Sequence, residues 1–124
     1  MDAGSRPRPG RLELGRRGED LAACFLALAG LEVLGRNLRV RHLEIDLLAC
    51  EGDCLVAVEV RLRRSDRYGG AAASVTPAKR QRLRTAVRSE RQRRGWRGPC
   101  RVDLLALDWE AGRQRLVLEH YRGI

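Results

Sequence analysis

Apolar residues recur along the chain with two different periods, and the changes of period outline its elements. Within residues 14–28 they fall at three-, four- and seven-residue offsets, as on one face of a helix. This stretch predicts a helix of about 15 residues that ends at Gly30. A second helix is predicted over residues 77–94, with Thr76 as its N-cap and Pro77 in its first turn.

Five shorter apolar runs predict strands, which in chain order are residues 31–40, 44–50, 54–62, 102–107 and 116–121. The first run is interrupted by Gly35-Arg36-Asn37, and Gly52-Asp53 provides a turn between the second run and the third. Residues 63–75 are rich in charge and glycine, and they predict a mobile loop. The order helix, three strands, helix, two strands predicts an α/β domain with helices flanking a mixed sheet.

The length of 124 residues corresponds to one small domain. Residues 1–11 combine arginine and proline without an apolar pattern, so we expect a disordered basic tail before a domain that spans residues 12–124. The formal net charge is +9, and arginine provides nearly all of the positive charge because Lys79 is the only lysine. This balance favours a polyanionic partner, first nucleic acid and then a membrane surface, although a compositional bias toward arginine would produce it too.

An apolar stretch near the start of the chain, residues 21–31, follows a basic segment, as in signal peptides. Glu13, Glu19 and Asp20 interrupt the positive segment, and the apolar stretch is too short to span a membrane. We therefore expect a cytoplasmic protein that does not bind membranes.

Two of the four cysteines, Cys50 and Cys54, flank the predicted turn at Gly52. They could form a cross-strand disulfide or half of a metal site, but His42 and His120 are isolated and zinc spacing is absent. Reduced, partly buried thiols are the preferred interpretation for all four cysteines.

Two short strings place acidic residues inside apolar runs: Glu44-Ile45-Asp46-Leu47 and Glu59-Val60-Arg61. A buried carboxylate is costly unless it is paired or binds a metal. If the two predicted strands are neighbours, Asp46, Glu59 and Arg61 converge, because alternate residues of a strand share a face. Two carboxylates beside a cation can hold a divalent metal against a phosphate. The structural alternative is a buried ion pair between these acids and Arg61 or Arg101.

In their order and spacing these strings resemble the motifs of the bacterial YraN family (uncharacterised protein family 0102). The matching features are a helix carrying Glu19, the Glu-Ile-Asp string, the Val-Glu-Val string with a basic residue, a Pro-Ala-Lys helix and an Arg-Val-Asp strand. The resemblance covers about residues 14–121. The family is similar to archaeal Holliday-junction resolvases. The resemblance therefore implies a restriction-endonuclease-like fold with the element order αβββαββ.

The resemblance also implies a metal site for Mg²⁺ or Mn²⁺. Asp46 and Glu59 match the metal ligands of the nuclease motif, and Glu19 matches a helix glutamate that often completes such sites. The backbone carbonyl of Val60 could add a further ligand. Arg101 and Asp103 match the Arg-hydrophobic-Asp string, for which structural ion pairing is expected.

Two positions depart from the family pattern. Arg61 stands where the pattern has its catalytic lysine, and Leu43 stands where it has a glycine. Arginine can clamp a phosphate but does not readily give up its proton, so Arg61 suits phosphate binding better than proton transfer. Lys79 lies on the second predicted helix, where the family also has a lysine, and it could supply part of the missing function. The alternative is a lysine on the surface of that helix.

The second predicted helix is dense in arginine, which is typical of a solvated face but also suggests contact with phosphates. The residues expected to contact nucleic acid are Arg80, Arg84, Arg88, Arg91 and Trp96. Trp96 could stack on an unpaired base, and packing over the end of the helix is the alternative. Trp109 is expected to lie in the core beside the last turn.

These features predict a metal-dependent DNA endonuclease, with specificity for branched DNA suggested by the resolvase resemblance. A nuclease-fold accessory protein that binds nucleic acid, with catalysis impaired by Arg61 in place of lysine, is the alternative function. A third interpretation is an interaction domain for an acidic protein partner. A homodimer would match the two strands that must be cut in a four-way junction.

Overall fold

The computed structural model describes residues 11–64 and 70–124, with side chains in the first helix described from Gly15 onward. Most of the predicted basic tail and residues 65–69 of the predicted mobile loop therefore lie outside the described residues. Arg11, the last residue assigned to the tail, is instead the first residue of a helix.

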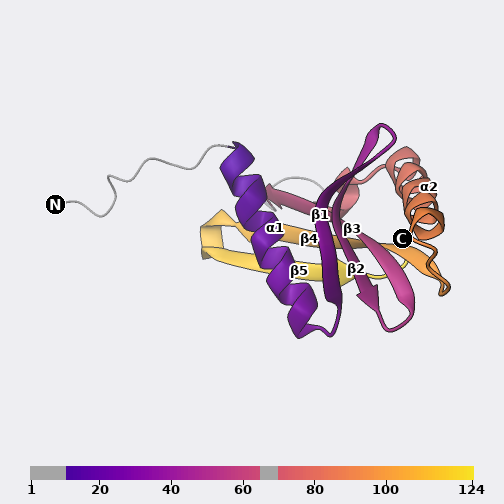
Figure 1. Cartoon of the computed structure of the whole chain (residues 1–124). Helices are drawn as coiled ribbons and strands as arrows, with labels where there is room; N and C mark the ends of the chain where they lie inside the picture. Colours follow the sequence, from indigo (N-terminus) through magenta and orange to yellow (C-terminus); the bar gives the residue numbers. More distant parts are fainter. Residues whose placement is uncertain (1–10, 65–69) are drawn as a thin grey trace.

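Two helices and five strands follow one another in the predicted order (Figure 1). They are α1 (Arg11–Leu28), β1 (Glu32–Val40), β2 (Leu43–Glu51), β3 (Cys54–Arg64), α2 (Pro77–Arg93), β4 (Cys100–Glu110) and β5 (Arg115–Tyr121). Short 3-10 turns, η2 (Ala72–Ser74) and η3 (Ala111–Arg113), precede α2 and β5. The α/β fold class and the order αβββαββ are confirmed.

The five strands form one mixed sheet in the order β1-β2-β3-β4-β5. β3 and β4 are parallel, because α2 carries the chain back between them, and the other neighbouring pairs are antiparallel. The arrangement, a mixed sheet with a helix on each face, is that of the restriction-endonuclease-like class. This crossover places the start of α2 beside the C-terminal half of β3.

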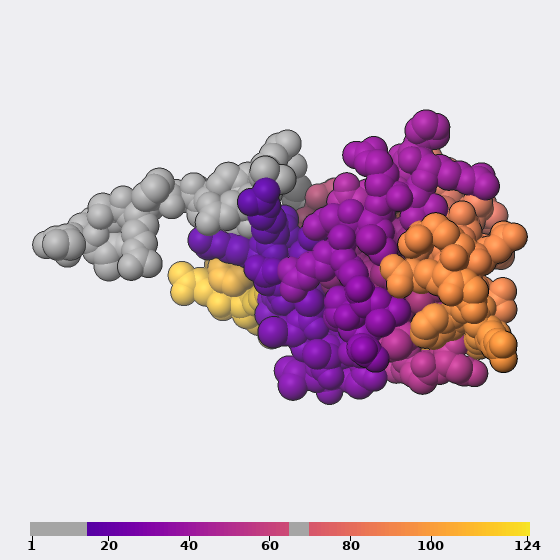
Figure 2. Space-filling model, in the orientation of Figure 1, coloured from indigo at the N-terminus to yellow at the C-terminus, as the bar shows by residue number. Residues whose placement is uncertain are grey.

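The helices cover opposite faces of the sheet. Ala22 and Leu26 of α1 pack in one cluster with β2 residues such as Leu47. Leu83 and Val87 of α2 pack in a second cluster on the other face. In Figure 2 the orange surface of α2 lies against the purple surface of β1 and β2. Because a helix packs on each face of the sheet, the central strands carry apolar residues on both faces.

The boundaries of the elements differ from the predictions in ways that have local causes. The predicted break in the first strand is a register shift between Val33 and Gly35 within a continuous β1. Asn37, in the same strand, adopts a positive φ of 51°. Thr76 is confirmed as the N-cap of α2, because its Oγ1 accepts a hydrogen bond of 3.1 Å from the backbone N–H of Lys79.

All four cysteines are free thiols. Cys50, Cys54 and Cys100 are half-buried as expected, but Cys24 of α1 is exposed. None of the helices in the described chain is long and apolar enough to cross a membrane.

Candidate functional site

The strands β2 and β3 part at the point where both acidic strings lie. Their last pair is Leu47 with Val58, after which the earlier residues of β2 pair only with β1 and the later residues of β3 pair only with β4. Asp46 and Glu59 are the first residues beyond that last pair. The fork therefore brings two carboxylates together where neither strand fills the space between them.

Beyond the last β2–β3 pair, the backbone N–H of Val60 has no carbonyl partner on β2 and donates to the side chain of Asp46 instead. The N–H of Val60 donates to Oδ2 of Asp46 over 2.9 Å. Burial, followed by a hydrogen bond to Glu59 and the negative charge of Glu59, raises the pKa of Asp46 to about 7. The Val60 N–H and the charge of Lys79 oppose this rise only in part. Asp46 is therefore harder to ionise than an isolated aspartate.

Glu59 is almost fully buried, with 3% of its surface exposed, and two cations approach the same oxygen. Nη2 of Arg61 lies 3.1 Å from Oε2 of Glu59, and Nζ of Lys79 lies 3.7 Å from it. Lys79 reaches Glu59 from the first turn of α2, which Thr76 caps. The structure therefore places Lys79 at the acid pair, half-buried, and not on the free surface of the helix.

Arg61 carries a further unsatisfied group. Its Nε is buried and has no hydrogen-bond partner among the residues that the structure describes. The buried Nε is closed to a ligand, but 24% of the Arg61 side chain is exposed, and a guanidinium has further donors for a phosphate oxygen.

Glu19 approaches Asp46 from α1, on the face of the sheet opposite to α2 and Lys79. It is half-buried, and burial followed by the charge of Asp46 raises its pKa, while a hydrogen bond to Asn37 lowers it. Glu19 and Asp46 line the same hollow, together with residues of β3, β4 and β5. The hollow has a volume of about 820 Å³ and opens beside the fork.

Within residues 11–64 and 70–124, no group of three or more His, Cys, Asp or Glu side chains is arranged to hold a metal. A metal site here would therefore depend on Asp46 and Glu59, and the role of Glu19 as a third ligand stays a prediction. Two carboxylates are enough for Mg²⁺, which keeps several waters and takes its remaining oxygens from substrate phosphates. The donor set fits that ion and does not form a closed cage.

Arg101 is not a partner of the acid pair, so the alternative that joined it to Asp46 or Glu59 is wrong. Its guanidinium binds both oxygens of Asp103, at 2.8 and 3.1 Å, and also Glu51 at 2.9 Å. Asp103 is fully buried. Burial alone would raise its pKa, but hydrogen bonds from Arg101, the Gly123 N–H and His120 lower it. The expected structural ion pairing of Arg101 and Asp103 is confirmed.

The arginines of α2 divide into anchored and free groups. Arg84 donates to the carbonyl of Ile124 over 3.0 Å, and Arg91 donates to the carbonyl of Gly98 over 2.6 Å. Arg88 is exposed, and Arg80 is half-buried with an Nε that lacks a partner in the described structure. Two of the four arginines predicted to contact nucleic acid are thus already used to tie α2 to other segments.

Trp96 lies over the end of α2 as a packing residue. Its indole N–H donates to the carbonyl of Asp53 over 2.8 Å, and its ring packs against the cluster beneath α2. This contact joins the end of α2 to the β2–β3 turn, at the far end of β2 and β3 from the fork. A role for Trp96 in binding a base stays a prediction.

Sequence reasoning missed a group of residues on the wall of the hollow beside the acid pair. Trp109 was expected in the core, yet 37% of its surface is exposed. It lines the hollow with Leu116 and with the last residues of β3, Arg63 and Arg64. The alternation along β4 places Trp109 on the face of α1, where Gly15 and Gly18 of α1 line the same hollow. In the sequence, this alternation was the signal that could have placed Trp109 beside the hollow.

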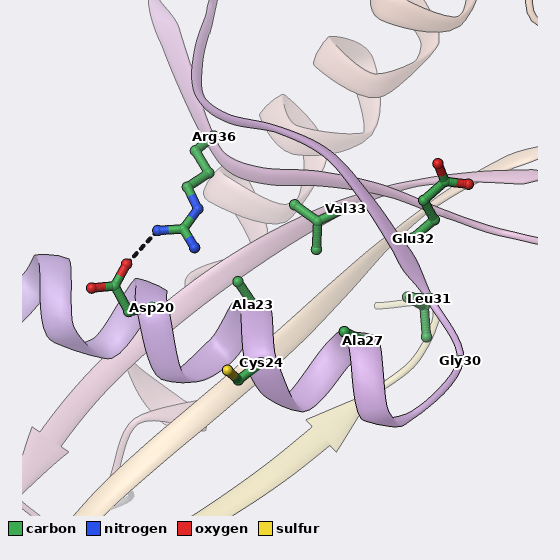
Figure 3. A pocket seen from close by; sticks show the side chains of 9 residues that line it. All are labelled: Asp20, Ala23, Cys24, Ala27, Gly30, Leu31, Glu32, Val33 and Arg36. Atoms are coloured by element: carbon green, nitrogen blue, oxygen red, sulfur yellow. Dashed lines mark hydrogen bonds and ion pairs between the residues drawn. The ribbon is translucent and has the colours of Figure 1, made fainter.

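A second hollow, of about 650 Å³, lies between α1 and the start of β1 (Figure 3). Small residues of α1, Ala23 and Ala27, form one wall, and Val33 faces them from β1. An ion pair between Arg36 and Asp20 closes one end. None of the predicted site residues lines this hollow, so it does not extend the acid pair.

Comparison with known proteins agrees with the resemblance seen in the motifs. The pattern of Uncharacterised protein family UPF0102 matches residues 18–107, which include Glu19, Asp46, Glu59 and Lys79. A UPF0102 protein of Janthinobacterium sp. (strain Marseille) is 46% identical over 103 residues, covering 83% of this chain and 84% of its own. One of Alkalilimnicola ehrlichii is 48% identical over 108 residues, covering 86% and 85%.

A third relative extends the match over nearly the whole chain. The UPF0102 protein of Renibacterium salmoninarum is 43% identical over 115 residues, covering 92% of this chain and 97% of its own. The strands that form the fork and the helix that supplies Lys79 all fall within the matched residues. The chain therefore belongs to the uncharacterised protein family UPF0102.

Proposed function

We propose that this protein is a metal-dependent endonuclease that hydrolyses phosphodiester bonds of DNA at the fork between β2 and β3. The observation that carries the proposal is the pair of adjacent carboxylates, Asp46 and Glu59, facing two cations at the end of an open hollow. A pair of acids that repel one another inside an apolar sheet is costly for folding alone. Such an arrangement is typical of a site that binds a cation and acts on a phosphate.

Asp46 and Glu59 would hold Mg²⁺ or Mn²⁺. The carbonyl of Val60 would be a further ligand, because the N–H and C=O of a strand residue point to the same side and the N–H of Val60 points to Asp46. The bound ion would neutralise charge on the phosphate and activate a water molecule. The raised pKa of Asp46 supports this role, since a divalent cation replaces the proton that the crowded pair otherwise retains.

Lys79 and Arg61 would together perform the role of the single lysine in the family pattern: Arg61 binds the phosphate and Lys79 orients the water molecule. The guanidinium of Arg61 keeps its charge and clamps a phosphate oxygen through its remaining donors. The ammonium of Lys79, 3.7 Å from Glu59, can orient a water molecule and exchange a proton with it. The loss of lysine at position 61 is therefore compensated from a neighbouring helix.

The surroundings of the site suit a DNA backbone. The net charge of +9 favours a polyanion, and Arg88 on α2 is exposed to a phosphate, whereas the unpaired Nε of Arg80 is buried. Specificity for branched DNA and a homodimer belong to the proposal through the resemblance to resolvases. In such a dimer each copy would cut one strand of a junction. A cytoplasmic location belongs to the proposal because acidic residues interrupt the segment that resembles a signal peptide.

One observation favours a second function, that of an accessory protein that binds nucleic acid without cutting it. Glu59 already pairs with both Arg61 and Lys79, so its charge is compensated without a metal. If these ion pairs persist when DNA binds, the site would clamp a phosphate and leave it intact.

The experiment that tests the proposal is cleavage of labelled single-stranded, duplex, forked and four-way-junction DNA with Mg²⁺ or Mn²⁺. Wild type, Asp46→Asn and Arg61→Lys would be compared. Asp53→Asn is the matched control, because Asp53 is an exposed acid in the β2–β3 turn at the other end of the strands. Metal-dependent cutting that Asp46→Asn abolishes and Asp53→Asn preserves is the expected result. Binding without cutting by every variant would leave the accessory function.

A further inference from the structure

The hollow beside the acid pair continues along the C-terminal half of β3 to the end of β4. Across this end of the sheet, Arg64 of β3 is paired with Trp109 of β4, and Trp109 is paired with Leu116 of β5. Paired residues on neighbouring strands present their side chains on the same face. All three line the hollow together with Arg63, and these four residues are called the Trp109 groove below.

The apolar members of the Trp109 groove do not belong to the core. Trp109 is 37% exposed and Leu116 is 39% exposed, and neither takes part in the clusters beneath α1 and α2. In the described part of the chain, the indole N–H of Trp109 has no hydrogen-bond partner, whereas that of Trp96 is bound to Asp53. A large aromatic side chain kept at the surface without a polar partner indicates a site that contacts a ligand.

The charge around the groove is positive. Arg63 and Arg64 are exposed at the end of β3, and Arg61 stands between them and Glu59. Neither Arg63 nor Arg64 forms an ion pair with an acid in the described structure. Arg63 does donate a hydrogen bond to the carbonyl of Leu62. An aromatic surface beside guanidinium groups is the combination by which proteins bind single-stranded nucleic acid, because bases stack on the ring and phosphates pair with the cations.

The distance between the Trp109 groove and the acid pair can be spanned by a short single strand of nucleic acid. Val60, which is hydrogen-bonded to Asp46, is four residues before Arg64 along β3, a span of about 13 Å in an extended strand. A short stretch of single strand covers that span. On the opposite wall, Gly15 and Gly18 of α1 carry no side chains that would narrow the hollow.

We propose that the Trp109 groove binds an unpaired nucleotide, stacked on the indole of Trp109, while the acid pair acts on a phosphate a short distance along the same strand. The inference rests on the proposed nuclease function and adds the class of its substrate. A base inside a duplex has no free face for the indole, so the groove selects nucleic acid with a single-stranded segment: a flap, a fork, a bubble or a free single strand. A fully paired four-way junction would not fill it.

The test uses the intrinsic fluorescence of Trp109, because Trp96 and Trp109 are the only tryptophans. In the Trp96→Phe protein, Trp109 is the sole emitter, and binding is measured in EDTA so that cleavage plays no part. We expect a thymidine oligonucleotide to quench the emission and a blunt duplex of mixed sequence to leave it unchanged. Absence of quenching by the oligonucleotide would overturn the inference.

A second measurement works in the otherwise wild-type chain, so that the test does not depend on the folding of Trp96→Phe. Fluorescence anisotropy of a labelled thymidine oligonucleotide would compare Trp109→Ala with Trp109→Phe. We expect the alanine variant to bind about 10- to 100-fold more weakly, and the phenylalanine variant to retain most of the affinity. Binding of the blunt duplex should be the same in both variants. Equal losses for oligonucleotide and duplex would overturn the inference.

The outcomes separate this inference from the proposed function. If wild type cuts DNA and Trp109→Ala still binds the oligonucleotide as tightly as wild type, the groove proposal fails and the nuclease stands. If the oligonucleotide quenches Trp109 in the Trp96→Phe protein, with and without Asp46→Asn, but wild type cuts no substrate, the groove stands and the nuclease fails. Quenching by an acidic peptide and not by the oligonucleotide would assign the groove to a protein ligand and overturn the inference.

Discussion

Two acidic residues on the strands of this sheet, Asp46 and Asp103, have pKa values shifted in opposite directions. Both interrupt apolar runs, and both lose most of their contact with water. Around Asp103, hydrogen bonds from Arg101, the Gly123 N–H and His120 outweigh burial, and its pKa is lowered. Around Asp46, burial and the neighbouring Glu59 outweigh a single backbone N–H, and its pKa is raised to about 7.

The groups around each acid account for the opposite shifts of the two pKa values. Asp103 is surrounded by donors and joins β4 to β5 and the C-terminal residues, so its charge is part of the fold. Asp46 lies at a fork with a second carboxylate and opens to a hollow, so its charge is a cost that the fold alone does not offset. The two acids should therefore respond in opposite ways to substitution and to pH.

The largest effect is expected from Asp103→Asn. The amide cannot replace the charge that pairs with Arg101, and it would leave one of the donors of this buried network without an acceptor. We expect a loss of about 4 kcal/mol in the free energy of unfolding, measured by urea denaturation. Asp46→Asn is the matched control and should be at least as stable as wild type at pH 7. Equal losses of unfolding free energy in both variants would show that the two acids contribute equally to folding, against the prediction.

The second prediction concerns pH in metal-free buffer. The pKa of Asp46 is raised in the folded state, so the folded protein retains a proton that the unfolded chain releases above about pH 4. Stability should therefore fall as pH rises from about 4 to 7. The advantage of Asp46→Asn over wild type should grow by about 3 kcal/mol across that range. Asp103 acts in the opposite sense, because its lowered pKa adds stability that is lost only in more acidic solution.

Unfolding by urea at several pH values, with EDTA present, measures this difference. A constant difference between Asp46→Asn and wild type from pH 4 to 7 would show that Asp46 ionises as it does in an unfolded chain.

The third prediction asks whether the cations at the fork serve chemistry or folding. Lys79→Met removes one of the two positive charges at Glu59 and should lower cleavage about 100-fold. Its effect on stability should be below about 1 kcal/mol, because Arg61 stays paired with Glu59 at 3.1 Å when Lys79 is removed. Lys79→Arg retains the charge and should restore stability without restoring cleavage. Full activity in Lys79→Arg would limit Lys79 to an electrostatic role.

The smallest effect is expected on α2, where Arg91 is bound to another segment of the fold and Arg88 is exposed to solvent. Arg88 is exposed, so Arg88→Gln should leave the free energy of unfolding within about 0.5 kcal/mol of wild type. It should weaken DNA binding and reduce the slope of log affinity against log salt by about one. Arg91→Gln removes the hydrogen bond to Gly98, so we expect a loss of stability there. Titrations with duplex DNA at several salt concentrations measure the slope, and an unchanged slope in Arg88→Gln would remove Arg88 from the interface.

The sequence predicted the fold and indicated the candidate site residues because those signals are local. Thr76 and Pro77 mark the start of α2 by their own backbone preferences, and Gly52 marks the β2–β3 turn. Acids within apolar runs are visible in the sequence, and their order and spacing are enough to indicate the family. The prediction for Trp109 was wrong because an aromatic residue late in an apolar strand looks the same in the sequence whether it is buried or lines a hollow.

The set of elements and the identity of the charged residues within them follow from the sequence alone. The tertiary structure decided which charges meet: Lys79 with Glu59, Arg101 with Asp103, and Asp46 with a carboxylate in place of a cation. It also decided where β2 and β3 part and which apolar side chains stay exposed. The physical reason is that helix caps, turns and strand alternation depend on neighbours in the chain, whereas burial and pKa depend on groups that only folding brings together.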